Sequence, residues 1–278
     1  MNGKKFSGLL ICTDLDGTLY RNDKSISREN SEAIEYFKEN GGLFTFITGR
    51  MPYFSDDAYN RINPNAPFGC INGGGIYDHR TKEYVWKQPI DTSVFELVHY
   101  VMDAMSETAD YGIQLNTFDT IYFLRDDPSS VWFRDITGMP YRTCDINTFD
   151  ESLAKIVFTS NESSIVLEIA QLLNRHPRVD EFDFIRSEQK LYEILPKGVD
   201  KGTVLPRLAE HLGISMDKTI AIGDYNNDIG MIRTAGLGIA VSNAVDEVKA
   251  IADHVTVSNE EHAIARIISD IESGKLKI

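Results

Sequence analysis

Two carboxylates, Asp14 and Asp16, directly follow an apolar stretch of strand-like length at residues 9–13, and Gly17 comes next. In an extended backbone, residues i and i+2 point to the same face, so both acidic side chains can reach one space. Glycine lets the chain turn sharply and approach a ligand closely. Because two neighbouring carboxylates repel each other, they need a cation, a shared proton or free hydration. The pattern therefore indicates a cation or proton site, with a solvated acidic turn as the alternative.

A calcium-binding EF-hand loop is a further explanation for closely spaced acidic residues. Such a loop requires Gly at its sixth position and Glu at its twelfth. Counted from Asp14, these positions hold Leu19 and Ser25. The calcium-loop pattern therefore does not apply.

The composition sets limits on the class of protein. The chain has 278 residues, enough for one large domain or two of medium size. Its 42% hydrophobic and 25% charged residues are typical of a soluble globular protein. The net charge of −14 argues against a nucleic-acid-binding surface or an anionic-membrane anchor, since both need clustered Lys and Arg. A phosphorylated substrate is still compatible with this charge, because one local cation or metal can bind an anion.

Sequence features also bear on the location of the protein. No stretch approaches the ~20 apolar residues of a membrane span, and residues 1–6 lack the apolar core of a signal peptide. The three cysteines are isolated and show no CxxC spacing, which fits a reducing compartment. We therefore expect a cytoplasmic protein with a small-molecule substrate and no nucleic-acid or membrane partner, and a monomer by default.

Short apolar runs alternate with helical patterns at the start of the chain. Two further runs, 43–47 and 68–71, follow predicted helices. Such alternation predicts right-handed βαβ units and a parallel sheet with helices on its faces. Ligands bind at the carboxyl ends of such strands. Asp14, Thr48 and Asn72, which follow the first three runs, are therefore expected to lie at a site.

The pattern changes near Trp86, where a strongly amphipathic helix is predicted from Asp91 onward. Pairs of strand-like runs follow, at 112–116 with 120–124 and at 183–185 with 191–195. Hairpins imply an antiparallel sheet. We therefore expect a second, α+β domain that is inserted into the first.

The first pattern resumes after the insertion. A helix is predicted to begin at Lys201, and the buried run 219–222 ends in Gly223 and Asp224. The C-terminal helix is expected to start at the N-cap Ser258. The overall prediction is an α/β fold with a Rossmann-like parallel-sheet core at residues 1–85 and 196–278, and an inserted cap at residues 86–195.

Four short motifs, in order along the chain, are similar to those of the haloacid dehalogenase (HAD) superfamily phosphatases of the Cof type, which carry an inserted C2 cap. The motifs are DxDGT at 14–18, then Thr48, Gly49 and Arg50, then Lys201 and Gly202, and finally GDxxND at 223–228. Each motif alone is a weak or moderate signal. Four of them at the expected strand ends, with the insertion between the second and third, are specific. The resemblance covers nearly the whole chain and implies a HAD core with a cap that selects the substrate.

The resemblance implies a phosphatase that hydrolyses small phosphorylated metabolites, such as sugar, flavin or pyridoxal phosphates. Asp14 would be the nucleophile and would form an aspartyl-phosphate that water then hydrolyses. Asp16 would protonate the leaving alkoxide and later take a proton from the attacking water. The expected phosphate- and substrate-binding residues are Leu15, Thr48, Gly49, Lys201 and Asn227.

The same resemblance implies a Mg²⁺ ion. Its expected ligands are the carboxylates of Asp14 and Asp224 and the main-chain carbonyl of Asp16, while Asp228 would support the metal through water or orient Lys201. Mg²⁺ prefers such hard oxygen ligands. A cation is needed because the attacking carboxylate and the phosphate monoester are both negatively charged.

Several alternatives stay open at the level of the sequence. Lys197 is a rival to Lys201, although Gly202 and the following helix favour Lys201. Arg50 is expected either to form a structural ion pair or to guide an anionic substrate, and the loop at 72–75 has no assigned role. The alternative functions are a phosphomutase of the same architecture and a non-catalytic phosphate or metabolite sensor. The sequence does not identify the physiological substrate.

Overall fold

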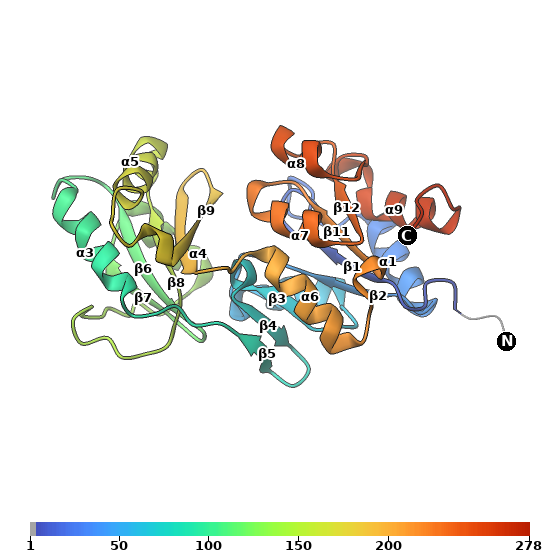
Figure 1. Ribbon diagram of the computed structural model, residues 1–278, viewed down its shortest axis with the longest axis horizontal. Coiled ribbons are helices and arrows are strands. Elements are labelled where there is room, and N and C mark those ends of the chain that lie inside the picture. Colours follow the sequence, from blue (N-terminus) through green and yellow to red (C-terminus); the bar gives the residue numbers. More distant parts are fainter. Residues whose placement is uncertain (1–3) are drawn as a thin grey trace. The chain divides into compact units, whose positions relative to one another are not determined.

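The structure, a computed structural model, describes residues 4–278, which divide into two compact units (Figure 1). The first unit comprises the chain up to Lys87 together with Asp200–Ile278, and the second comprises Gln88–Val199. The predicted α/β class is confirmed, because the first unit contains a parallel sheet covered by helices. Among the described residues, no helix has the length and apolar character that crossing a membrane requires.

The first unit is built around a five-stranded parallel sheet with the strand order β13-β12-β11-β1-β2. The strands are β1 (Leu10–Thr13), β2 (Leu43–Phe46), β11 (Thr219–Gly223), β12 (Leu237–Ala240) and β13 (His254–Val255). All residues of β1, β11 and β12 are buried. Apolar runs without alternation are what a parallel sheet covered on both faces requires.

Helices flank this sheet (Figure 1). They are α1 (Arg28–Glu39), α2 (Asp56–Ile62), α6 (Lys201–Leu212), α7 (Ile229–Thr234), α8 (Asp246–Ile251) and α9 (Ala263–Glu272), with short 3-10 turns η1 (Pro52–Ser55), η2 (Ile71–Gly73), η4 (Met216–Lys218), η5 (Asn226–Asp228) and η6 (Asn259–Glu261). The Ser27 hydroxyl accepts a hydrogen bond from the Asn30 main-chain amide and caps α1. The C-terminal helix begins later than predicted. Ser258 caps the short turn η6, and the left-handed backbone of His262 (φ of 61°) separates this turn from α9.

The run at 68–71 is not a third strand of the parallel sheet, which corrects the prediction. Instead β3 (Phe68–Cys70) pairs antiparallel with β4 (Gly75–Asp78), which pairs in turn with β5 (Glu83–Lys87). The reason is local, because left-handed backbone follows β3 and turns the chain back along it. An isolated parallel bridge between Ile47 and Gly69 joins the backbone of β3 to the segment after β2.

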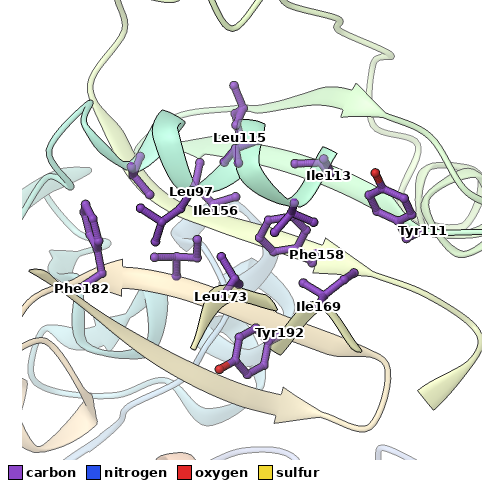
Figure 2. Close-up of a cluster of buried hydrophobic side chains, with 14 of the residues drawn as sticks. Leu97, Tyr111, Ile113, Leu115, Ile156, Phe158, Ile169, Leu173, Phe182 and Tyr192 are labelled. Atoms are coloured by element: carbon purple, nitrogen blue, oxygen red, sulfur yellow. The ribbon is translucent and has the colours of Figure 1, made fainter. Parts of the chain in front are cut away.

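The second unit contains a five-stranded antiparallel sheet with the order β7-β6-β8-β10-β9. Its strands are β6 (Gly112–Thr117), β7 (Ile121–Arg125), β8 (Leu153–Thr159), β9 (Phe182–Glu188) and β10 (Leu191–Pro196), and its helices are α3 (Val94–Ala104), α4 (Pro128–Thr137) and α5 (Ser163–Leu173), with a short turn η3 (Val179–Glu181). Apolar side chains of α3 and α5 pack with those of the sheet into one buried core (Figure 2). Both predicted hairpins, β6 with β7 and β9 with β10, are present.

Candidate active site

The acidic residues lie where parallel strands end. In the register of β1 and β11, Thr13 pairs with Ile222, and the Asp14 amide donates to the Ile222 carbonyl (2.8 Å). Asp14 and Asp224 therefore follow adjacent strands at the same edge of the sheet, while Thr48 follows β2 on the other side of β1. This is the edge at which parallel α/β sheets bind ligands.

Asp14, Asp224 and Asp228 form one cluster, in which each residue offers a carboxylate oxygen within 4.8 Å of the others. The Lys201 Nζ lies 2.5 Å from Asp14 Oδ1 and 2.6 Å from Asp228 Oδ1. Lys201 is the first residue of α6, and its side chain is completely buried. The structure thus joins the first, third and fourth motifs through one buried ammonium group.

Asp228 uses both of its carboxylate oxygens within the protein. Oδ1 accepts from Lys201, and Oδ2 accepts from the main-chain amides of Asp224 (2.9 Å) and Tyr225 (3.0 Å). Asp228 thereby fixes both the lysine and the backbone that carries Asp224. It has less capacity left for a direct metal bond than Asp14 or Asp224 has.

The turn after β1 is shaped to fit Asp224. The Thr18 hydroxyl donates to Asp224 Oδ1 (2.8 Å). Gly17 has φ of 83°, and a Cβ atom there would lie 2.4 Å from Asp224 Oδ2. A side chain at position 17 would therefore collide with the acidic cluster and strain the backbone.

The electrostatics of the cluster are unbalanced. Burial raises the pKa of Asp14 well above its ordinary value, against the opposing effect of Lys201. Burial and the nearby Asp228 charge raise the pKa of Asp224 to about 6. Burial would lower the pKa of Lys201, but the charges of Asp14 and Asp228 outweigh it and raise that pKa. Three carboxylates face one ammonium group, so the cluster has an excess of negative charge that suits a divalent cation with hard oxygen ligands.

Asp16 points its carboxylate at two cations. The Arg50 Nη2 donates to Asp16 Oδ1 (2.9 Å) and Oδ2 (2.7 Å), and the Lys24 Nζ donates to Oδ1 (2.9 Å). Burial acts to raise the pKa of Asp16, but the charges and hydrogen bonds of Arg50 and Lys24 outweigh it and lower that pKa. The Arg50 guanidinium also lies over the Tyr20 ring, 5.7 Å from its centroid. Of the two roles expected for Arg50, the structure shows the ion pair.

Asn72 connects the second motif with the fourth. The Asn72 main-chain amide donates to the Thr48 main-chain carbonyl (3.1 Å), and the Asn72 side-chain Oδ1 accepts from Asn227 Nδ2 (3.1 Å). The Thr48 hydroxyl accepts from the Arg50 amide (3.3 Å). A Cβ atom on Gly49 would lie 2.7 Å from Asn72 Oδ1, so a side chain at position 49 would displace the Asn72 side-chain amide.

The loop that carries Asn72 has unusual backbone geometry. Ile71, Asn72 and Gly73 have φ values of 56°, 50° and 105°. Asparagine and glycine accept the left-handed region, whereas a β-branched residue such as Ile71 is strained there. Backbone strain of this kind is concentrated at functional sites. The Gly73 backbone lies so close to the start of α6 that a Cβ atom on Gly73 would be 1.9 Å from the Asp200 carbonyl oxygen.

The structure also separates the two candidate lysines. Lys197 donates to Asp183 (2.9 Å) within the second unit, whereas Lys201 contacts Asp14 within the first unit. The Leu15 side chain is completely buried, which leaves only its main chain for contact with a ligand. Sequence reasoning missed Thr18 and Lys24. Thr18 belongs to the first motif, whereas nothing in the sequence distinguishes Lys24 from other surface lysines.

Comparison with known structures first defines the class. The fold matches a crystal structure of a haloacid dehalogenase-like hydrolase from Bacteroides thetaiotaomicron with a TM-score of 0.77 and 27% identity, covering 95% of this chain and 99% of that one. Two Bacillus subtilis (strain 168) relatives, named 5-amino-6-(5-phospho-D-ribitylamino)uracil phosphatases YitU and YwtE, are 26% and 28% identical, covering 94% and 95% of this chain and 96% and 98% of their own lengths. The family model for haloacid dehalogenase-like hydrolases matches residues 11–268. The chain therefore belongs to this family, which confirms the resemblance seen in the four motifs.

Proposed function

We propose that this protein is a Mg²⁺-dependent phosphatase that hydrolyses small phosphorylated metabolites through an aspartyl-phosphate on Asp14. The observation that carries the proposal is the buried Lys201, held between Asp14 and Asp228 beside Asp224 at the carboxyl edge of the parallel sheet. The relatives YitU and YwtE, which are named for the removal of phosphate from a ribityl-bearing metabolite, support the substrate class.

The donor set fits the proposed metal. Asp14, Asp224 and the main-chain carbonyl of Asp16 would hold the ion, with Asp228 behind them. A bound Mg²⁺ would offset the negative charge of the phosphate and of the attacking carboxylate. The all-oxygen character of the cluster and its excess negative charge support this assignment.

In the first chemical step an Asp14 oxygen would attack phosphorus. The bond between phosphorus and the ester oxygen would break, and the electron pair would leave on that oxygen, which takes a proton from Asp16. In the second step water would attack the aspartyl-phosphate and give its proton to Asp16, which releases inorganic phosphate and restores Asp14.

The other residues would stabilise charge on the transferring phosphoryl group. Phosphoryl transfer depends mainly on positioning and electrostatics. The protein groups that would contact the phosphoryl oxygens are the Lys201 ammonium, the Thr48 hydroxyl, the Asn227 side-chain amide and the main-chain amides of Leu15 and Gly49. The Thr48 main chain and the Asn227 side chain both contact the buried Asn72, which supports a fixed position for these two residues.

The ion pairs of Asp16 bear on its two roles. Arg50 and Lys24 favour the ionised carboxylate, which is the form that accepts a proton from water in the second step. The first step needs a protonated Asp16. We therefore expect the contact between Arg50 and Asp16 to loosen when a substrate is bound.

The test is phosphate release from an aryl phosphate with Mg²⁺, with and without a chelator. We expect Asp14→Asn to lose activity by a factor of about 10⁴ or more, as when a catalytic nucleophile is removed. The matched control is Asp246→Asn, which alters a fully exposed aspartate at the start of α8 and should leave the rate unchanged. Retained turnover in Asp14→Asn would remove Asp14 from its role. Isomerisation of a sugar phosphate without free phosphate would instead favour the phosphomutase, and binding without turnover would favour the sensor.

A further inference from the structure

Asn72 lies in a buried turn that contacts segments of two motifs. Its main-chain amide donates to the Thr48 carbonyl (3.1 Å), and the amide of Ile71 before it donates to the Arg50 carbonyl (2.9 Å). The Asn72 side chain reaches the fourth motif, where Asn227 Nδ2 donates to Asn72 Oδ1 (3.1 Å). Asn72 is completely buried, and all of these residues belong to the first unit. The turn thus holds one side-chain oxygen at a fixed place beside a residue that is proposed to bind phosphate.

The backbone and the charge of the site restrict the residue type at position 72. Asn72 has φ of 50°, in the left-handed region that glycine, asparagine and aspartate adopt at low cost. Glycine offers no side-chain acceptor. Aspartate would add a negative charge next to the cluster that contains Asp228, the neighbour of Asn227 in sequence, which already has three carboxylates for one ammonium group. Asparagine combines the left-handed backbone with a neutral acceptor.

The contact with Asn72 decides which way the Asn227 side-chain amide faces. Such an amide carries an acceptor oxygen and a nitrogen with two donor hydrogens, and a half-turn of the group exchanges them. In the reversed orientation the oxygens of Asn72 and Asn227 would face and repel each other. In the observed orientation one N–H of Asn227 Nδ2 donates to Asn72, which leaves the second N–H of the same nitrogen for a ligand. Phosphoryl oxygens are acceptors, so they require a donor of this kind.

We propose that Asn72 is a positioning residue, whose side-chain oxygen holds Asn227 with an N–H directed at the phosphoryl group. The inference rests on the proposed phosphatase function, in which Asn227 contacts the phosphoryl oxygens, and it gives a role to the loop at 72–75. Asn72 acts through Asn227 and makes no contact with the substrate. This indirect action is separable from a purely structural one, because removal of the Asn227 amide should make the Asn72 side chain dispensable for turnover.

The experiment is a double-mutant cycle on kcat/KM for phenyl phosphate. Asn72→Gly removes the acceptor and keeps a residue that is at ease in the left-handed backbone, while Asn227→Ala removes the donor. Each single change should lower kcat/KM about 10- to 100-fold, the effect of one lost hydrogen bond to a charged group. Once Asn227 is alanine, Asn72→Gly should change kcat/KM further by about twofold or less, because residues that act through one contact are not additive.

The matched control is Asn63→Gly. Asn63 is also an asparagine of the first unit with left-handed backbone (φ of 48°), but its side chain is exposed at the end of α2. This control should leave kcat/KM unchanged. Two outcomes would overturn the inference and leave the phosphatase proposal intact. In one, Asn72→Gly turns over phenyl phosphate as fast as the unaltered protein. In the other, the losses of the two single variants multiply in the double variant, so that Asn72 acts by another route.

If the unaltered protein releases no phosphate from phenyl phosphate, the phosphatase proposal fails and NMR decides on Asn72. The side-chain amide signals that Asn227→Ala removes should shift when inorganic phosphate is titrated in with Mg²⁺. In Asn72→Gly the same shift should require about tenfold more phosphate or more. Signals that stay in place in the unaltered protein, or an equal phosphate dependence in both proteins, would overturn the inference.

Discussion

Each unit buries a lysine, and the two lysines have different surroundings. Lys155 in the second unit forms an ion pair with Glu193 (2.7 Å), and the two charges of this pair cancel. Lys201 in the first unit forms ion pairs with Asp14 and Asp228, and Asp224 belongs to the same cluster. One ammonium group therefore lies among three carboxylates. A buried pair of one ammonium and one carboxylate carries no net charge, and its net contribution to stability is small. An unbalanced cluster is incomplete until a cation or a substrate contributes charge, and this difference separates a structural ion pair from a site.

The largest expected effect comes from replacing each lysine by methionine. Both Lys201→Met and Lys155→Met leave buried carboxylates unpaired, so each should lower the free energy of unfolding by about 3–5 kcal/mol, measured by urea denaturation. Only Lys201→Met should also abolish turnover of phenyl phosphate, by a factor of about 10³ or more, because it removes charge from the transferring group. Similar turnover losses in both folded variants would contradict the proposed distinction.

The next effect concerns Mg²⁺ and pH. The pKa of Asp224 is raised from 3.8 to about 6, so between these pH values the folded, metal-free protein keeps a proton that the unfolded chain loses. The stability that this group contributes is present below pH 3.8 and is lost as the pH rises through about 6. Mg²⁺ should therefore raise the unfolding temperature more near pH 7.5 than near pH 5. At a concentration 100 times its Kd, the bound ion would add about 2.7 kcal/mol to the free energy of unfolding.

Differential scanning calorimetry with and without Mg²⁺ measures this effect. Asp224→Asn, which removes a proposed ligand and the titrating group together, should show neither the pH dependence nor the metal shift. A metal shift that persists in this variant would place the ion elsewhere.

A smaller effect is expected when the balanced pair is removed as a whole. The double variant Lys155→Met with Glu193→Leu replaces both charges by apolar groups, so it should lie within about 1 kcal/mol of the unaltered protein, or above it, even though each single change is costly. Urea denaturation of the two singles and the double completes the cycle. A double variant as unstable as the singles would show that the pair is needed for the fold.

The smallest effect is expected at Arg50, whose ion pair with Asp16 is partly exposed to solvent. Arg50→Gln removes the charge that lowers the pKa of Asp16, so that pKa should rise, as a carbon-detected NMR titration would show. Because Asp16 has a lowered pKa, this stabilisation is present above its ordinary pKa and is lost as the pH falls below it. The loss of stability at neutral pH should stay below about 1 kcal/mol. An unchanged Asp16 pKa would leave Lys24 as the partner that matters.

The sequence predicted the strands that carry the cluster because their apolar runs end abruptly in polar residues. Asp14 and Asp224 were expected at one edge of a parallel sheet, and the register of β1 with β11 places them there. Local signals and chain order were sufficient for this part of the fold.

The remaining features depend on contacts between distant residues, which spacing alone does not encode. The choice between Lys197 and Lys201 needed the pairing of Lys197 with Asp183. The ion pair of Arg50 with Asp16 spans the turn after β1 and the end of β2, and no local pattern predicts it. The strand β3 was misassigned because the left-handed turn at Ile71 is unusual for a β-branched residue.

Two glycines set the position of Lys201 without contacting the cluster themselves. A Cβ atom on Gly202 would lie 2.5 Å from the Gly230 backbone, and one on Gly230 would lie 2.1 Å from Asp200 Oδ2, the carboxylate that caps α6. A methyl group on Gly202 would therefore push α6 away from α7, and one on Gly230 would displace the Asp200 carboxylate that caps α6, so either change would move the Lys201 ammonium group. In a saturation mutagenesis screen for turnover, both glycines should score as if they were part of the chemistry, although neither carries a reactive atom.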